Sequence, residues 1–137
     1  MGLLYKSVRA VERVCAQLLD NQRCSSNLPR PKFFNHKSAH DFVINNHDLP
    51  GKKILEIGSR EVTGASVMRK SIKKAEYIGM DVIPGKNVDI VGDAHRLKDY
   101  FPPNSIDVIC SYSVFEHLMM PWIFAEQASS VLKVGGR

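Results

Sequence analysis

Residues 54–64 read ILEIGSREVTG, and this stretch decides the fold of the chain. It begins with a short, mostly apolar run that is typical of a buried strand in a parallel sheet. Gly58 follows the run directly, and a glycine at that point lets the backbone approach a ligand closely. Open parallel sheets bind ligands at the carboxyl ends of their strands, so we expect a ligand-binding loop here.

The residues around and after this loop alternate between strands and helices. The sequence predicts strands over residues 53–57, 77–82, 88–91 and 106–111, helices from about residues 65 and 114, and a last helix over residues 123–132. This alternation indicates an α/β fold, namely a Rossmann-like parallel sheet with flanking helices.

Residues 1–50 precede this pattern and are predicted to form an N-terminal helical segment and linker. Apolar side chains at helical spacing predict a helix over residues 3–20 with a basic opposite side. Turn-forming residues predict a linker over residues 21–35. A short helix is expected to begin at Ser38, with Ser38 and Asp41 as its capping box.

Composition disfavours several classes of partner. The 137 residues carry a formal net charge of +5 that is spread along the chain, without a basic patch interleaved with aromatic residues. We therefore expect no nucleic-acid partner. No apolar run approaches the roughly 18 residues of a membrane span. The three cysteines form no CxxC pair and the histidines show no metal spacing, which predicts no metal site and a reducing, cytoplasmic location.

An acidic residue at the end of the second predicted strand suits an adenosine ligand. Asp81 lies about twenty residues past the glycine loop, where one carboxylate can accept hydrogen bonds from both ribose hydroxyls. The loop lacks the GxGxxG pattern of dinucleotide sites, and Ala65 stands where a P-loop would need lysine. The pattern disfavours a phosphate-cradling NTPase and leaves a nicotinamide-dependent oxidoreductase open as an alternative.

Five ordered segments carry a resemblance to a known family. They read ILEIGS with a later glycine, YIGMDV, GDAHRL, SIDVICSYSVFEHL and VLKVGG, and they lie within residues 52–137. In this order and spacing they resemble the class I S-adenosylmethionine-dependent methyltransferases, in particular the broad type 11 subgroup. The resemblance implies that residues 51–137 form an S-adenosylmethionine-binding domain with four strands in the order 3-2-1-4.

The resemblance also implies roles for individual residues. Gly58 would pass under the methionine part of the cofactor, Asp81 would hold the ribose, and Asp93 would accept from the adenine amino group. Glu56 and the Ser111 backbone would face the methionine amino group. The full set of implied cofactor-binding residues is Glu56, Gly58, Ser59, Gly64, Asp81, Asp93, Ala94 and Ser111.

The glycine loop departs from the family pattern at one point. The dipeptide Ser59-Arg60 stands where the family has its second glycine. A serine there requires a backbone with negative φ, because positive φ is strained for residues other than glycine. The sequence therefore predicts negative φ at Ser59.

The implied reaction is methyl transfer from the sulfonium of S-adenosylmethionine to a small-molecule acceptor that the sequence does not identify. The cofactor carries the chemistry, and the protein supplies alignment and, in some enzymes, a base. Glu116 and His117 follow the fourth predicted strand and are the candidate catalytic residues. His117 could act as a base near neutral pH. The alternative is that the pair merely starts a helix.

The chain ends at Arg137, where the family begins its fifth strand. The resemblance therefore implies a domain truncated at its C-terminus, or a remnant that only binds the cofactor. The fourth strand would then be an exposed apolar edge, which predicts self-association. A third alternative is a non-catalytic interaction module that uses this edge or the N-terminal helix.

Overall fold

The computed structural model describes residues 36–62 and 67–137. The elements in chain order are α2 (His36–His47), β1 (Lys53–Ile57), α3 (Val67–Ser71), β2 (Glu76–Asp81), β3 (Ile90–Val91), the 3-10 helix η1 (Ala94–Asp99), β4 (Val108–Ser111), the 3-10 helix η2 (Phe115–His117) and α4 (Pro121–Val131). The helix and linker predicted over residues 3–20 and 21–35 lie outside the described residues, as does Gly64.

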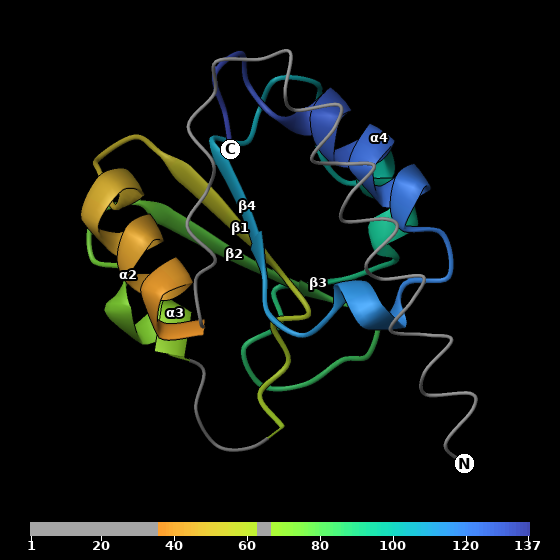
Figure 1. Cartoon of the computed structure of the whole chain (residues 1–137), viewed down its shortest axis with the longest axis horizontal. Helices are drawn as coiled ribbons and strands as arrows, with labels where there is room; N and C mark the ends of the chain where they lie inside the picture. The colour runs from red at the N-terminus through yellow and green to blue at the C-terminus, as the bar shows by residue number, and fades with distance from the viewer. Residues whose placement is uncertain (1–35, 63–66) are drawn as a thin grey trace, which may run out of the picture. The chain divides into compact units, whose positions relative to one another are not determined.

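The four strands form one sheet in the order β3-β2-β1-β4 (Figure 1). All neighbouring pairs are parallel: β1 pairs with β2 and with β4, and β2 pairs with β3. The predicted α/β class and strand order are therefore confirmed. Because the strands run the same way, their carboxyl ends meet at one edge of the sheet, and the loops that leave this edge can enclose a ligand.

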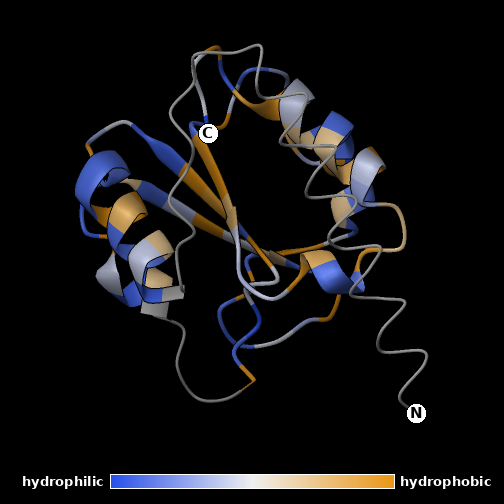
Figure 2. Ribbon diagram, in the orientation of Figure 1, coloured by the Kyte–Doolittle hydropathy of each residue, from blue (hydrophilic) through white to orange (hydrophobic). Residues whose placement is uncertain are grey.

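The central strand β1 is buried on both faces, as its apolar sequence predicts. One face packs on α4 and η1, and its buried cluster includes Leu55, Ile57, Met80, Leu97, Phe124 and Val131. The other face packs on α2 and α3 through Ile54, Val43, Met68, Ile72 and Val108. Figures 1 and 2 show these helices on opposite sides of a sheet whose strands carry much of the hydrophobic sequence.

The strand boundaries differ from the prediction by one or two residues at several ends. β2 starts and ends one residue earlier than expected, because the Asp81 carboxylate accepts a hydrogen bond from the Ile83 N–H at 2.9 Å and turns the chain. β3 starts two residues later than expected, since the Val88 N–H donates to the Gly85 carbonyl at 3.3 Å and closes a turn. β4 begins at Val108 because Ile106 forms an isolated parallel bridge with Leu132.

The first helix of the described residues begins earlier than predicted. α2 starts at His36, so Ser38 lies inside the helix and the predicted capping box is wrong. The Asp41 carboxylate instead lies 2.6 Å from the Lys37 Nζ one helical turn away and 3.3 Å from the His40 Nδ1. The helix packs on the sheet through Val43, which is 7% exposed.

The helix predicted from about Val114 is reduced to the single 3-10 turn η2. The chain leaves that turn at Leu118 in an extended conformation, with φ −76° and ψ 126°. Met120 precedes Pro121, and proline disfavours a helical conformation in the residue before it. Pro121 then starts α4, two residues before the predicted start of the helix over residues 123–132.

The outer edge of β4 is partly covered by the end of the same chain. The Arg137 N–H donates to the Asp107 carbonyl at 3.1 Å, and the Ile109 N–H donates to the Arg137 carbonyl at 2.7 Å. Lys133 adds a hydrogen bond to the Ile106 carbonyl at 2.8 Å. The expectation of a wholly unpaired edge is therefore wrong, and its argument for self-association applies only to the end of β4 beyond Ile109.

Candidate functional site

A cleft of about 900 Å³ opens at the carboxyl ends of β1, β2 and β4. A cleft of this size suits a nucleoside-containing ligand. The loops after β1, β2 and β4 and the start of η1 contribute its walls. Its polar and charged lining includes Arg60, Glu61, Asp81, Asp93, His95 and His117.

The structure brings together some of the residues predicted from the sequence and separates others. Gly58, Asp81, Asp93, Ala94 and His117 line the cleft. Glu56, Ser59, Ser111 and Glu116 do not line it. The candidate pair Glu116-His117 is thus divided, with only the histidine facing the cleft.

The glycine loop is held close to the neighbouring strand. The N–H groups of Gly58 and Ser59 both donate to the Met80 carbonyl, at 2.8 and 3.1 Å. Gly58 has a φ of 74°, and a Cβ atom there would lie 2.2 Å from the Val114 Cγ2. Only glycine fits this position without strain or displacement. Among the described residues, the non-glycine positions with positive φ are Asn87, Asn104 and Ser113, so the prediction for Ser59 is confirmed.

Asp81 presents a carboxylate that the backbone holds in place. Its Oδ2 accepts from the Arg60 N–H at 3.2 Å, and its Oδ1 accepts from the Ile83 N–H at 2.9 Å. The Arg60 Nε lies 4.0 Å from Oδ1. Each carboxylate oxygen can accept more than one hydrogen bond, so both can still receive a ligand hydroxyl.

Asp93 caps η1 and faces the same cleft. Its Oδ1 accepts from the His95 N–H at 2.8 Å and lies 2.7 Å from the His95 Nδ1. The backbone N–H of His95, followed by its ring, holds the pKa of Asp93 below its ordinary value. The carboxylate is therefore an ionised acceptor at neutral pH, and its Oδ2 has no partner among the described residues. Ala94 is buried beside it.

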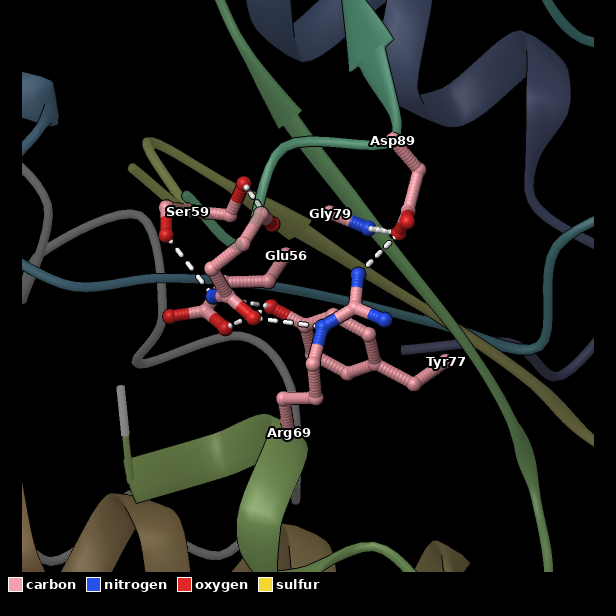
Figure 3. A network of polar contacts seen from close by, with 7 residues as sticks. Glu56, Ser59, Arg69, Tyr77, Gly79 and Asp89 are labelled. Atoms are coloured by element: carbon pink, nitrogen blue, oxygen red, sulfur yellow. Dashed lines mark hydrogen bonds and ion pairs between the residues drawn. The ribbon is translucent and has the colours of Figure 1, made fainter. Parts of the chain in front are cut away.

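Glu56 does not line the cleft but belongs to a polar network that includes Ser59 of the glycine loop (Figure 3). It accepts a hydrogen bond from the Tyr77 hydroxyl, and its burial raises its pKa. The Asn87 Nδ2 donates to the Tyr77 hydroxyl at 3.1 Å and to the Ser59 carbonyl at 2.8 Å. In return, the Ser59 hydroxyl donates to the Asn87 carbonyl at 3.1 Å.

Arg69 and Asp89 extend this network to α3 and to β2 (Figure 3). The Arg69 guanidinium lies over the Tyr77 ring, 4.4 Å from its centroid, and hydrogen-bonds to Asn87 and Asp89. Asp89 also accepts from the Gly79 N–H at 2.7 Å. The network thus holds the backbone of the glycine loop at Ser59, outside the lining of the cleft. No local pattern in the sequence brings these residues together, so the network could not be predicted from it.

We expect Tyr77→Phe to lower the free energy of unfolding by about 1–3 kcal/mol, because it leaves the buried Glu56 carboxylate without a donor. Urea unfolding at pH 7 measures this change. Tyr100→Phe is the matched control, because Tyr100 is 37% exposed and should change the free energy by less than about 0.5 kcal/mol. Equal effects of the two substitutions would contradict the role of the network.

Comparison with known proteins agrees with this geometry. A family model described as a methyltransferase domain matches residues 51–137. The chain belongs to this family. This membership does not support the nicotinamide-dependent oxidoreductase that the sequence left open. The matched residues include all four strands and the residues that line the cleft.

A solved structure from Methanococcus maripaludis has a similar fold, with a TM-score of 0.55 at 19% sequence identity. It is provisionally assigned as an S-adenosyl-L-methionine-dependent methyltransferase. The match covers 72% of this chain and 51% of that one, so this chain spans about half the length of the relative. No curated protein matches the chain.

The described residues also bear on membrane and metal binding. Across residues 36–62 and 67–137, no helix combines the length and the apolar character needed to cross a membrane. Within the same ranges, no group of three or more His, Cys, Asp or Glu side chains could hold a metal ion.

Proposed function

We propose that the cleft binds S-adenosylmethionine and that the chain takes part in methyl transfer to a small-molecule acceptor. The observation that carries this proposal is the placement of two carboxylates, Asp81 and Asp93, in one cleft of about 900 Å³ beside Gly58. An adenosine has a ribose diol and an amino group that these two acids can accept from. The methyltransferase family match supports the same cofactor.

The chain's own residues would bind and orient the cofactor. Asp81 would accept from the ribose hydroxyls, Asp93 from the adenine amino group, and Gly58 would leave room for the methionine part. We propose the Ser111 backbone for the methionine amino group, because the residues directly after it line the cleft. Glu56 would act through Tyr77 and the network rather than by contact.

When bound, S-adenosylmethionine supplies an electrophilic methyl group on a sulfonium. The protein then needs to align an acceptor and, where the acceptor carries a proton, to remove it. His117 lines the cleft after β4 and is the residue we propose for that proton. Glu116 is exposed and lies outside the lining, so the proposal for a base rests on His117 alone.

We also propose a cytoplasmic location. Cys110 is a free thiol in the described part of the chain, and unpaired cysteines are typical of reducing compartments.

Titration calorimetry with S-adenosylhomocysteine tests the cofactor proposal. We expect the wild-type chain to bind and Asp81→Ala to bind at least about tenfold more weakly, since hydrogen bonds to a charged group contribute about 1.5–3 kcal/mol. Asp41→Ala is the control, because Asp41 lies on α2 outside the cleft, and it should keep wild-type affinity. A folded wild-type chain that binds no S-adenosylhomocysteine, or an Asp81→Ala variant with wild-type affinity, would overturn the proposal.

A further inference from the structure

His95 connects two parts of the cleft wall that are distant in the sequence. It lies at the start of η1, where its side chain is 15% exposed and lines the cleft. Its Nδ1 lies 2.7 Å from the Asp93 Oδ1, and its Nε2 lies 3.3 Å from the backbone nitrogen of Met120. Leu118 and Met119, which directly precede Met120, line the same cleft.

Only one form of the imidazole satisfies both contacts. The Met120 N–H can only donate, so the Nε2 must accept. The ring hydrogen of a neutral imidazole then lies on Nδ1, from which it donates to the Asp93 carboxylate. A protonated imidazole carries a hydrogen on both nitrogens. It still donates from Nδ1 to Asp93. Its Nε2, however, carries a hydrogen and can no longer accept from the Met120 N–H.

We propose that His95 is a positioning residue that, in its neutral form, holds residues 118–120 against the cleft and makes cofactor binding depend on pH. This inference rests on the proposed function. Protonation of His95 releases the segment and its apolar contacts to the ligand. It also draws the Asp93 carboxylate into an ion pair, which weakens that acid as an acceptor for an adenine amino group. Both effects lower affinity as the pH falls.

The charged groups around His95 define the controls. On η1, Arg96 forms an ion pair with Asp99, and the Lys98 Nζ lies 3.7 Å from the Oε1 of Glu126 on α4. Across the cleft, Arg60 lies beside Asp81. η2 contributes Glu116, outside the lining, and His117, the other histidine of the cleft. The experiment must therefore separate the two histidines.

Two substitutions at His95 each preserve one of its two contacts and remove the other. In His95→Gln, the longer side chain can place an amide oxygen near the Met120 N–H, and it does not titrate. In His95→Asn, the shorter side chain can donate to Asp93 but cannot reach Met120. Calorimetry with S-adenosylhomocysteine at pH 8, 7, 6 and 5.5 measures the affinity of each variant, and circular dichroism checks the fold at each pH.

We expect the wild-type affinity to fall about fivefold to tenfold between pH 8 and pH 5.5, since about one hydrogen bond is lost. His95→Gln should keep near wild-type affinity at pH 8 with a flat profile, and His95→Asn should bind weakly throughout. His117→Gln should retain the wild-type dependence on pH. If His95→Asn does not fold, the pH dependence of binding by His95→Gln tests the proposal by itself.

The outcomes separate this inference from the proposed function. A folded wild-type chain that does not bind at pH 8 contradicts the function itself. If the wild-type affinity does not depend on pH, or if the affinity of His95→Gln still falls as the pH falls, the role of His95 is contradicted. Neither result contradicts the proposed function. A slope that disappears in His117→Gln assigns the effect to the other histidine and also overturns the inference.

Discussion

Gly58→Ala is expected to lower the free energy of unfolding by about 3 kcal/mol and to abolish measurable binding of S-adenosylhomocysteine. Two costs add at this position. The φ of 74° is strained for alanine, and the new Cβ would lie 2.2 Å from the Val114 Cγ2. Relief of that contact requires Val114 or the loop to move, and both belong to the wall of the cleft. Urea unfolding and calorimetry measure the two effects.

Two further variants separate strain from collision. Gly51→Ala has a similar φ of 77° with nothing within 4 Å of the added Cβ, so it should cost only about 1 kcal/mol. In a Val114→Ala background, Gly58→Ala should also cost about 1 kcal/mol, because the colliding methyl group is gone. A full cost that persists in this background would show that the Val114 contact is not the cause.

Asp107→Asn is expected to lower the free energy of unfolding at pH 7 by about 2 kcal/mol. Burial by itself would raise the pKa of Asp107, whose side chain is 6% exposed. The Lys133 and Lys52 ammonium groups, at 2.6 and 2.9 Å, and the Lys53 N–H at 3.0 Å outweigh burial and lower the pKa to about 2. The native state therefore favours the ionised carboxylate.

The sign of the pH dependence follows from that lowered pKa. The stabilisation by the Asp107 carboxylate is complete above the unfolded pKa of about 3.8 and is lost as the pH falls through the folded pKa of about 2. The difference between the wild type and Asp107→Asn should therefore shrink toward zero between pH 5 and pH 2. Urea unfolding across this range measures it.

Asp41→Asn provides the comparison for Asp107. Asp41 pairs with Lys37 on the exposed side of α2, where water screens the pair, and its removal should leave the free energy of unfolding nearly unchanged. If the two variants behave alike, the three donors around Asp107 do not stabilise the fold as we infer.

The sequence predicted correctly those features that depend on residues close together in the chain. The apolar run before Gly58 predicted β1, and the position of Asp81 at the end of the second strand predicted that this acid would lie beside the cleft. Both predictions depend on adjacent residues and on the rule that parallel strands end at one edge. The fold class followed from the alternation of strands and helices, whereas the strand order followed from the family resemblance.

The sequence was a poor guide wherever distant segments decide the outcome. Glu56 precedes Gly58 by two residues, yet its side chain turns to Tyr77 on the opposite face of the sheet from Leu55 and Ile57. Asn87 joins Ser59 through loop contacts that leave no periodic signal. Hydrogen bonds of this kind depend on tertiary structure and not on spacing along the chain.

The polar network behind the glycine loop gives the loop an uneven response to ionic strength. Arg69 and Asp89 are 39% and 43% exposed, so added salt screens their attraction. The hydrogen bond between Tyr77 and Glu56 is part-buried, and Glu56 is only 9% exposed, so salt reaches it far less. In concentrated salt the contact between α3 and the segment before β3 thus weakens, while the hydrogen bond between Tyr77 of β2 and Glu56 of β1 persists.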